Sequence, residues 1–117
     1  MNIEEIVDYF IFYYFTLRRS PMEDEYLKYT EITEILKVLA HPIRFCIIVN
    51  LLKGGETNVT AMQDCLKIPQ STLSQHLQKL RSARLIEGKR DGLEINYQIK
   101  DESVAELVKS LLIVKSK

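Results

Sequence analysis

The chain has 117 residues, of which 46% are hydrophobic and 27% are charged. This length and composition indicate one globular domain with a core of its own, and they exclude a disordered chain or a fold that needs disulfides or a metal. Sixteen basic residues balance sixteen acidic ones, so no excess of charge points to a partner.

The basic residues are nevertheless concentrated in one part of the chain. Residues 1–40 carry four bases against eight acids, a net charge of −4, and residues 41–117 carry twelve bases against eight acids, a net charge of +4. In residues 67–90, six bases stand against the single acid Glu87, a net charge of +5. A basic region of this kind is typical of a surface that meets phosphate groups.

The first predicted helix covers about residues 2–17, where Asn2 and Glu5 form a capping pair. Six of the seven residues in Tyr9–Phe15 are aromatic and lie almost all round this helix, so another surface must cover them. The dipeptide Arg18-Arg19 suits its C-terminal end.

Three interpretations of residues 1–20 stay open. They form an added helix of a dimer, they dock on a partner or a membrane surface, or the natural chain starts at Met22. The apolar run Ile6–Leu17 is too short to span a bilayer and contains Asp8. Because the N-terminus is acidic and resembles no signal peptide, we expect a cytoplasmic protein without a membrane span.

Three further helices are predicted before residue 70. The second helix of the chain covers about residues 21–40, with Ser20 as its N-cap. His41-Pro42 separates it from the third helix, which ends at Gly54-Gly55. The fourth helix is short, begins at Thr57 or Asn58 and ends at Pro69. The apolar faces are Tyr29, Ile32, Leu36 and Leu39 in the second helix, Ile43, Ile47 and Leu51 in the third, and Val59, Met62 and Leu66 in the fourth.

A fifth helix is predicted over residues 71–83, capped by Ser71 or Thr72, and a hairpin over residues 85–100 follows it. In this hairpin the apolar residues recur at every second position, and Asp91-Gly92 is a turn signal. Asp101 caps a last helix. The inward residues are Leu73, Leu77, Leu80 and Arg84 in the fifth helix, Leu93, Ile95, Tyr97 and Ile99 in the hairpin, and Val104, Leu107, Val108 and Leu111 in the last helix.

The order of these elements predicts a mainly α-helical fold with a small β-hairpin. Residues 21–117 are predicted to form a winged helix-turn-helix domain, and residues 1–20 an extra, aromatic N-terminal helix associated with a dimer. The helix 71–83 would be the recognition helix and the hairpin 85–100 the basic wing.

The outward face of the predicted recognition helix is rich in hydrogen-bonding groups. Helical geometry places Ser71, Thr72, Gln75, Gln78 and Lys79 opposite the buried leucines. Gln can pair with adenine, and Ser or Thr with several base edges, so we predict sequence-specific recognition of double-stranded DNA. The alternative is a merely solvated face, which would more usually carry Glu and Lys.

The wing carries Lys89 and Arg90 beside its turn, where long cations can reach phosphates or enter a minor groove. The alternative is an ordinary solvated turn. Lys67 and Arg81 are expected to serve phosphates or packing, whereas Arg84 is expected to be inward and structural.

Three segments of the chain resemble ArsR-type repressors: Leu36–Arg44, Pro69–Leu77 and Gly92–Tyr97. The resemblance covers about residues 28–112. It implies an operator-binding repressor that is a homodimer, with the two subunits paired through the helix before the first segment and through the last helix. The two-fold symmetry of such a dimer predicts an inverted-repeat operator. The implied dimer residues are Tyr29, Ile32, Leu36, Leu107 and Leu111. Together with the helix face and the wing cations described above, the resemblance leads us to predict the DNA-binding residues Gln70, Ser71, Thr72, Ser74, Gln75, His76, Lys79, Lys89 and Arg90. His76 has an alternative, a half-buried histidine bonded to backbone.

The chain departs from the metal-sensing members of that family. The positions that match their paired cysteines hold Asn58 and Thr60, and the last helix has no histidine. Neither side chain supplies a thiolate to a soft metal. We therefore expect no metal site and no cofactor.

The two cysteines are expected to be buried and structural. Cys46 is placed on the inward side of its helix near Ile43 and Ile47, and Cys65 beside Met62 and Leu66. A redox switch is the alternative, although thiol-sensing relatives usually pair such a cysteine with one in the last helix, which has none here. No arrangement of catalytic residues stands out, so an enzyme is not predicted.

Two other functions stay open beside plain repression. One is the same repressor gated by thiol oxidation or by a small-molecule effector of unknown identity. The other is a winged-helix module that binds proteins and has lost DNA binding, which the acidic first forty residues and the aromatic helix would suit.

Overall fold

The computed structural model describes residues 1–17 and 21–116. The expected roles of Arg18, Arg19 and Ser20 at helix ends lie outside these residues. In chain order the elements are α1 (Ile3–Leu17), α2 (Pro21–Leu39), α3 (Pro42–Gly54), β1 (Thr57–Asn58), α4 (Val59–Leu66), α5 (Gln70–Ser82), β2 (Ile86–Asp91), β3 (Glu94–Ile99) and α6 (Glu102–Ser116).

The chain divides into two compact units, Met1–Glu34 and Ile35–Lys117. This division falls inside α2 and not at residue 20, where the sequence predicted the domain boundary. The functional boundary at residue 20 therefore stays a prediction.

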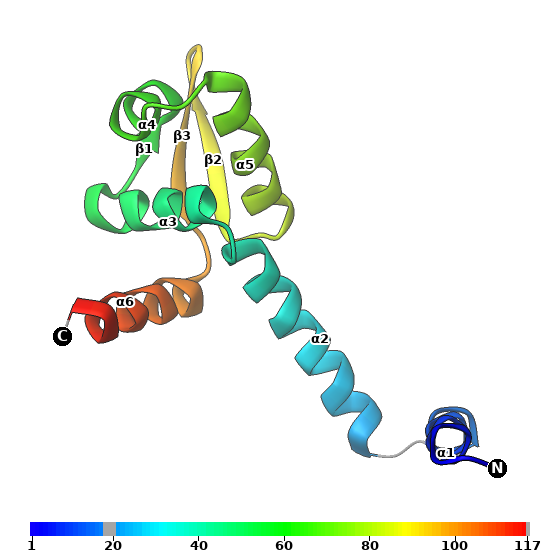
Figure 1. The fold of residues 1–117 in the computed structure, drawn as a ribbon. Helices are drawn as coiled ribbons and strands as arrows, with labels where there is room; N and C mark the ends of the chain where they lie inside the picture. The colour runs from blue at the N-terminus through cyan, green and yellow to red at the C-terminus, as the bar shows by residue number, and fades with distance from the viewer. Residues whose placement is uncertain (18–20, 117) are drawn as a thin grey trace. The chain divides into compact units, whose positions relative to one another are not determined.

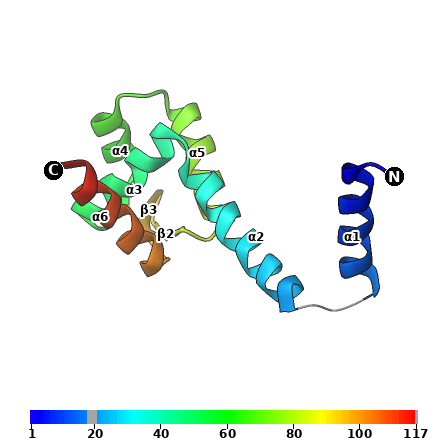
Figure 2. The ribbon, with the colours of Figure 1, turned by 60° about the horizontal axis from the view of Figure 1, so that its bottom comes forward.

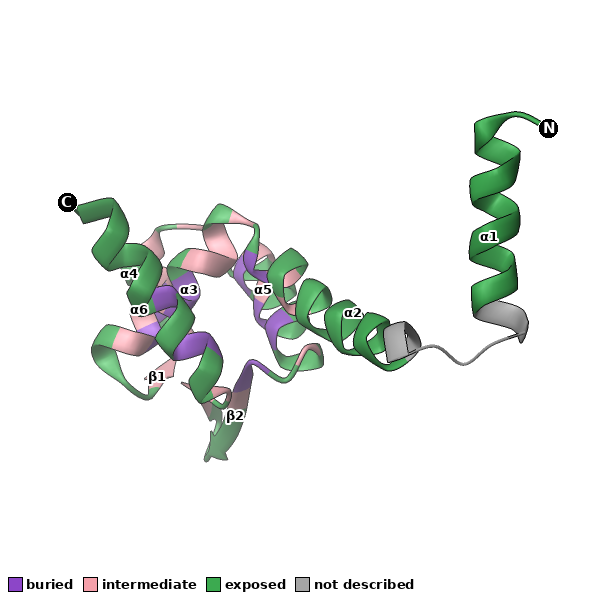
Figure 3. Ribbon diagram, turned by 90° about the horizontal axis from the view of Figure 1, so that it is seen from below, coloured by how far each residue is buried: buried purple, intermediate pink, exposed green. Residues whose placement is uncertain are grey.

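The N-terminal unit begins with the predicted cap. The backbone N–H of Glu5 donates a hydrogen bond of 2.8 Å to Oδ1 of Asn2. The rings of Phe10 and Tyr14, one turn apart, lie 4.7 Å from each other. Apolar side chains of α1 are exposed all round the helix, which is green along its described length in Figure 3.

The second unit opens at the predicted break between helices. His41 is the N-cap of α3, Nδ1 of its side chain accepts a hydrogen bond of 3.1 Å from the N–H of Ile43, and Pro42 occupies the first helical turn. Helix α3 ends as predicted, because Gly55 takes φ +68° and its N–H donates to the carbonyl of Leu51.

Helix α4 is capped by Asn58, whose Oδ1 accepts a hydrogen bond of 2.8 Å from the N–H of Ala61. The helix ends at Leu66, before the predicted end at Pro69. The reason is Lys67, which takes the left-handed conformation with φ +55° and closes the turn by donating to the carbonyl of Gln63.

We expect Asn58→Ala to lower the free energy of unfolding by about 0.5–2 kcal/mol, because the cap is lost. Thr60→Ala, on the exposed side of the same helix, is the matched control. Urea denaturation followed by circular dichroism measures both, and equal losses in the two variants would contradict the capping role.

Helix α5 begins at Gln70, one residue before the prediction. Its N-cap is Pro69, with no side-chain cap, so the predicted caps at Ser71 and Thr72 are wrong. The extended backbone of Pro69 instead presents its carbonyl to the N–H of Leu73. The inward placement of Arg84 is also wrong: the helix ends at Ser82, and Arg84 is exposed with φ +62°.

The sheet has three antiparallel strands in the order β1-β3-β2. Strand β1 was not predicted, because two residues are too few to show alternation. Asp91 pairs with Glu94, so the turn consists of Gly92 and Leu93. Gly92 supplies the positive φ of +65° that this turn needs at its first position. Leu93 is 105% exposed, so its expected place on the inward face of the strand is wrong.

One hydrophobic core holds the second unit together. Helices α3, α4 and α5 contact one another and the sheet, and α6 contacts α3; Figures 1 and 2 show these elements gathered in this way. No single helix in residues 1–17 and 21–116 is long and apolar enough to cross a membrane. The most buried side chains are Ile47, Ile48, Met62, Leu73, Leu77, Leu80, Leu85, Ile86 and Val108.

Candidate nucleic-acid interface

The two faces of α5 differ as the helical geometry predicted. Leu73, Leu77 and Leu80 are buried in the core, which fixes the rotation of the helix about its axis. The opposite face is polar and open to solvent. Of the predicted DNA-binding residues on α5, the exposed ones are Gln70, Ser71, Ser74, Gln75 and Lys79, and the half-buried ones are Thr72 and His76.

The wing presents its two cations on β2. Lys89 pairs with Asn96 and Arg90 with Ile95 across the ladder, and both cations are exposed. Neither is engaged in an ion pair with any other residue that the structure describes. The tip of the hairpin projects beyond α4 and α5 (Figure 1), so a duplex lying along α5 would be within reach of these side chains.

Polar contacts join the strands of the wing to each other and to the cap of α4. Nε2 of Gln98 donates a hydrogen bond of 2.6 Å to Oε1 of Glu87. Nδ2 of Asn58 donates one of 3.2 Å to Oε2 of Glu94. The Asn58 side chain therefore makes two stabilising contacts: it caps α4, and it links the start of this helix to β3 of the wing.

His76 packs against His41 at the junction of α3 and α5. The two ring centroids are 4.5 Å apart. His76 is half-buried. Its Nδ1 is buried and has no hydrogen-bond partner among the described residues, so the structure shows no bond from this atom to the backbone. The role of His76 at the DNA surface stays a prediction. Burial, and then the charges of His41, Arg44 and Lys79, lower the pKa of His76 below the ordinary histidine value.

This lowered pKa predicts a loss of stability at low pH. As the pH falls through the ordinary histidine pKa, His76 takes up a proton in the unfolded chain before it does so in the folded chain, which favours unfolding. Between about pH 7.5 and about pH 5.5 the melting temperature of the wild type should therefore fall further than that of His76→Gln. Thermal melts at several pH values measure this, and parallel curves would contradict it.

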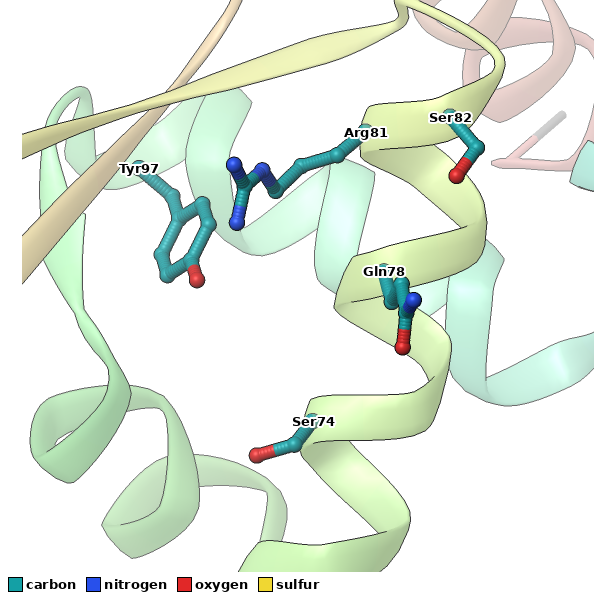
Figure 4. A pocket seen from close by; sticks show the side chains of 5 residues that line it. All are labelled: Ser74, Gln78, Arg81, Ser82 and Tyr97. Carbon is teal, nitrogen blue, oxygen red and sulfur yellow. The ribbon is translucent and has the colours of Figure 1, made fainter.

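A polar hollow of about 490 Å³ lies between α5 and β3. Figure 4 shows the Arg81 guanidinium reaching toward the ring of Tyr97, with the hydroxyls of Tyr97 and Ser74 directed into the space between strand and helix. Gln78 and Ser82 complete the lining. The sequence predicted that Gln78 faces outward and that Arg81 contacts phosphates or serves packing. It did not identify Ser82 or Tyr97 as site residues. Only the pairing of distant segments could have indicated them.

Comparisons with known proteins agree with this geometry. A family model described as a helix-turn-helix domain matches residues 39–89. The transcriptional repressor PagR of Bacillus anthracis is 42% identical over 87 residues, which are 74% of this chain and 87% of PagR. The biofilm growth-associated repressor of Xylella fastidiosa is 31% identical over 99 residues, which are 85% of this chain and 86% of that protein.

Solved structures show the same fold. The crystal structure of PagR matches with a TM-score of 0.68 over 74% of this chain and 98% of that chain. The repressor BigR from Xylella fastidiosa matches with a TM-score of 0.71 and 32% identity over 81% of this chain and 96% of that chain. This chain belongs to the ArsR family. The resemblance and the winged helix-turn-helix fold predicted from the sequence are thereby confirmed.

The cysteines of this ArsR-family chain are exposed, so the prediction that both are buried is wrong. Ile47, Ile48 and Leu51 face the core, and the inclusion of Ile48 turns the buried stripe of α3 away from Cys46. Cys65 lies at the edge of α4, where its Sγ accepts a hydrogen bond of 3.1 Å from Nδ2 of Asn50.

The expectation on metals concerns the positions where the sequence departs from metal-sensing members of the ArsR family. Asn58 is engaged in the cap of α4 and in the contact with Glu94, and Thr60 is exposed. Over the described ranges, no group of three His, Cys, Asp or Glu side chains is placed to hold a metal ion.

The residues implied in dimerisation lie on helix faces that are open in the single chain. Tyr29, Ile32 and Leu36 of α2 are exposed, and so are Leu107 and Leu111 of α6. Val104 and Val108, which the same apolar pattern placed beside them on α6, are buried instead. Helix α6 thus has one apolar side that packs in its own unit and another that is available to a partner.

Proposed function

We propose that this ArsR-family chain is a sequence-specific DNA-binding repressor that acts as a homodimer. The observation that carries the proposal is the exposed polar face of α5 beside a projecting hairpin with two exposed cations. The names of its relatives support it, since PagR and the biofilm growth-associated protein are both named repressors.

The two parts of the interface have different tasks in this proposal. Ser71 and Gln75 face base edges in the major groove, where amide and hydroxyl groups distinguish base pairs. Lys89 and Arg90 neutralise phosphates or enter the neighbouring minor groove. Phosphate contacts fix the register of the protein on the duplex, and base contacts supply the sequence preference.

The dimer is supported by the exposed apolar residues of α2 and α6, because such surfaces on a small chain are typical of association sites. Two-fold symmetry would place the two copies of α5 about one turn of DNA apart, roughly 34 Å. The operator is therefore expected to be an imperfect inverted repeat.

We also propose that residues 1–20 belong to the dimer, because α1 exposes apolar side chains all round. Deleting residues 1–21 should then lower the fraction of dimer at a given concentration, since apolar surface would no longer be buried on association. Analytical ultracentrifugation of both chains measures this. Unchanged solubility, dimer mass and DNA affinity would contradict a role in the dimer.

Fluorescence anisotropy tests the function directly. The labelled duplexes are DNA from upstream of the chain's own gene and a scrambled copy, each at two salt concentrations. A dimer has four of these cations, Lys89 and Arg90 of each copy. If all four contact phosphates, the affinity should fall about 10²-fold when the salt concentration rises fourfold. A salt-dependent preference for the native DNA supports the proposal. If no candidate operator binds and a pull-down yields a tight protein complex, the module that binds proteins replaces it.

A second candidate is the same repressor gated by thiol oxidation, which the exposure of Cys46 and Cys65 favours. Peroxide should then release the DNA from the wild type but not from Cys46→Ser or Cys65→Ser. Wild-type binding that is unchanged after peroxide would eliminate this candidate.

A further inference from the structure

The hollow between α5 and β3 is lined by groups that donate hydrogen bonds. They are the hydroxyls of Ser74, Ser82 and Tyr97, the amide of Gln78 and the guanidinium of Arg81. No carboxylate is among the lining residues that the structure describes. One fixed positive charge surrounded by neutral donors suits a ligand whose oxygens are negatively charged and only accept, such as a phosphate.

The donors are held in place by the two elements that carry them. Four belong to α5, whose rotation is set by its buried leucines. Tyr97 is only 6% exposed and sits in the middle strand, opposite Thr57 on one side and Gly88 on the other. Gly88 makes room for the ring, because a Cβ at this position would lie 3.1 Å from Cε1 of Tyr97 and 2.8 Å from Cγ2 of Ile95. The Tyr97 hydroxyl is therefore positioned before any ligand arrives.

These donors are also free to bind a ligand. Within the described residues, Arg81 forms no ion pair and the Tyr97 hydroxyl forms no hydrogen bond. The acid nearest in the ladder, Glu87, is engaged by Gln98. Since side chains alternate along a strand, Glu87 and Gln98 face the side of the sheet opposite to the ring of Tyr97.

We propose that this hollow binds a phosphate group of the DNA backbone. The inference rests on the proposed function and deepens it. The hollow lies between α5 and the strand β3 of the hairpin (Figure 4), beside the outward face of α5. The backbone of a duplex that meets both elements passes over this space. The contact joins recognition helix and wing to one phosphate and so fixes the register of the bases against Gln75.

Two variants test the site by anisotropy, with the native and scrambled duplexes at several salt concentrations. Tyr97→Phe keeps the ring and removes the hydroxyl, and Arg81→Gln removes the charge. Each should weaken binding to both duplexes about tenfold, because a charge-assisted hydrogen bond is lost without a change of bases. Arg81→Gln should also reduce the magnitude of the salt slope by about 0.9 per protomer. Lys53→Gln, at the far end of α3, is the matched control and should leave both affinities within about twofold.

A thermal melt confirms that each variant is folded, and the outcomes are then distinct. Parallel losses on both duplexes with the smaller salt slope support the site. Wild-type affinity in both variants, while Arg90→Ala still weakens binding, overturns the site and leaves the function intact. A wild type that binds no duplex overturns the function and the site together. Free inorganic phosphate is the other ligand that the hollow could bind, and its binding is measured by calorimetric titration. If Arg81→Gln abolishes phosphate binding without changing DNA affinity, the hollow serves a free anion and the assignment to DNA is wrong.

Discussion

Leu77→Ala is expected to lower the free energy of unfolding by about 2–5 kcal/mol, the largest effect we predict for a single substitution. Leu77 is 1% exposed and lies in the central row of α5, between Leu73 and Leu80. The loss has two parts, the transfer free energy of the deleted methyl and methylene groups and the cavity that they leave. Urea denaturation followed by circular dichroism measures it, with an unchanged m-value as the sign of an unchanged unfolded state.

Leu93→Ala is the matched control for this substitution. The same atoms are removed from a side chain that stands in solvent at the turn of the wing, so the change should stay within about 0.5 kcal/mol. Equal losses in the two variants would contradict the division between core and wing. A loss below about 1 kcal/mol for Leu77→Ala would contradict its place in the core.

Local features of the fold were predictable from the sequence. The caps at Asn2 and Asn58 and the break at His41-Pro42 are as expected, because each depends on residues within one helical turn. The polar face of α5 was predictable for a similar reason. Once Leu73, Leu77 and Leu80 are assigned to the core, helical geometry alone places Gln75 outside.

Features that depend on contacts between distant segments were not predictable. Strand β1 has two residues and exists because Thr57 and Asn58 meet the far side of β3. Cys46 was misplaced because the direction of the core around α3 includes Ile48, which a spacing of four residues does not reveal. Arg84 was misplaced because the apolar stripe of α5 was continued past Ser82, where the helix ends. Arg84 itself has a left-handed backbone conformation, which turns the chain away from the helix axis.

The candidate site divides in the same way. Helix periodicity and the charge at the hairpin indicated the surface that meets DNA. The hollow beside it requires a tyrosine of β3 and an arginine of α5 to lie on one side of the sheet, and a glycine of β2 to make room for the ring. Gly88 has no distinguishing feature in the sequence, and its task becomes visible only in the ladder with Tyr97.

Gln75→Ala is expected to reduce discrimination between the native and the scrambled duplex by about 1–3 kcal/mol, the value of one good bidentate contact to a base. Gln75 is exposed on the outward face of α5 and is neutral, so its loss removes no attraction to phosphate. The affinity for the scrambled duplex and the salt slope should therefore stay as in the wild type. Anisotropy titrations of both duplexes over a series of salt concentrations measure all three quantities.

Arg90→Ala is the matched partner of this variant, because it removes a charge from the wing and leaves α5 unchanged. It should weaken both duplexes to a similar degree and reduce the magnitude of the salt slope by about 0.9 per protomer. The contrast separates recognition of bases by α5 from attraction to phosphates by the wing. Equal loss of discrimination in Gln75→Ala and Arg90→Ala would mean that the wing itself recognises sequence, through base edges or through the width of the minor groove.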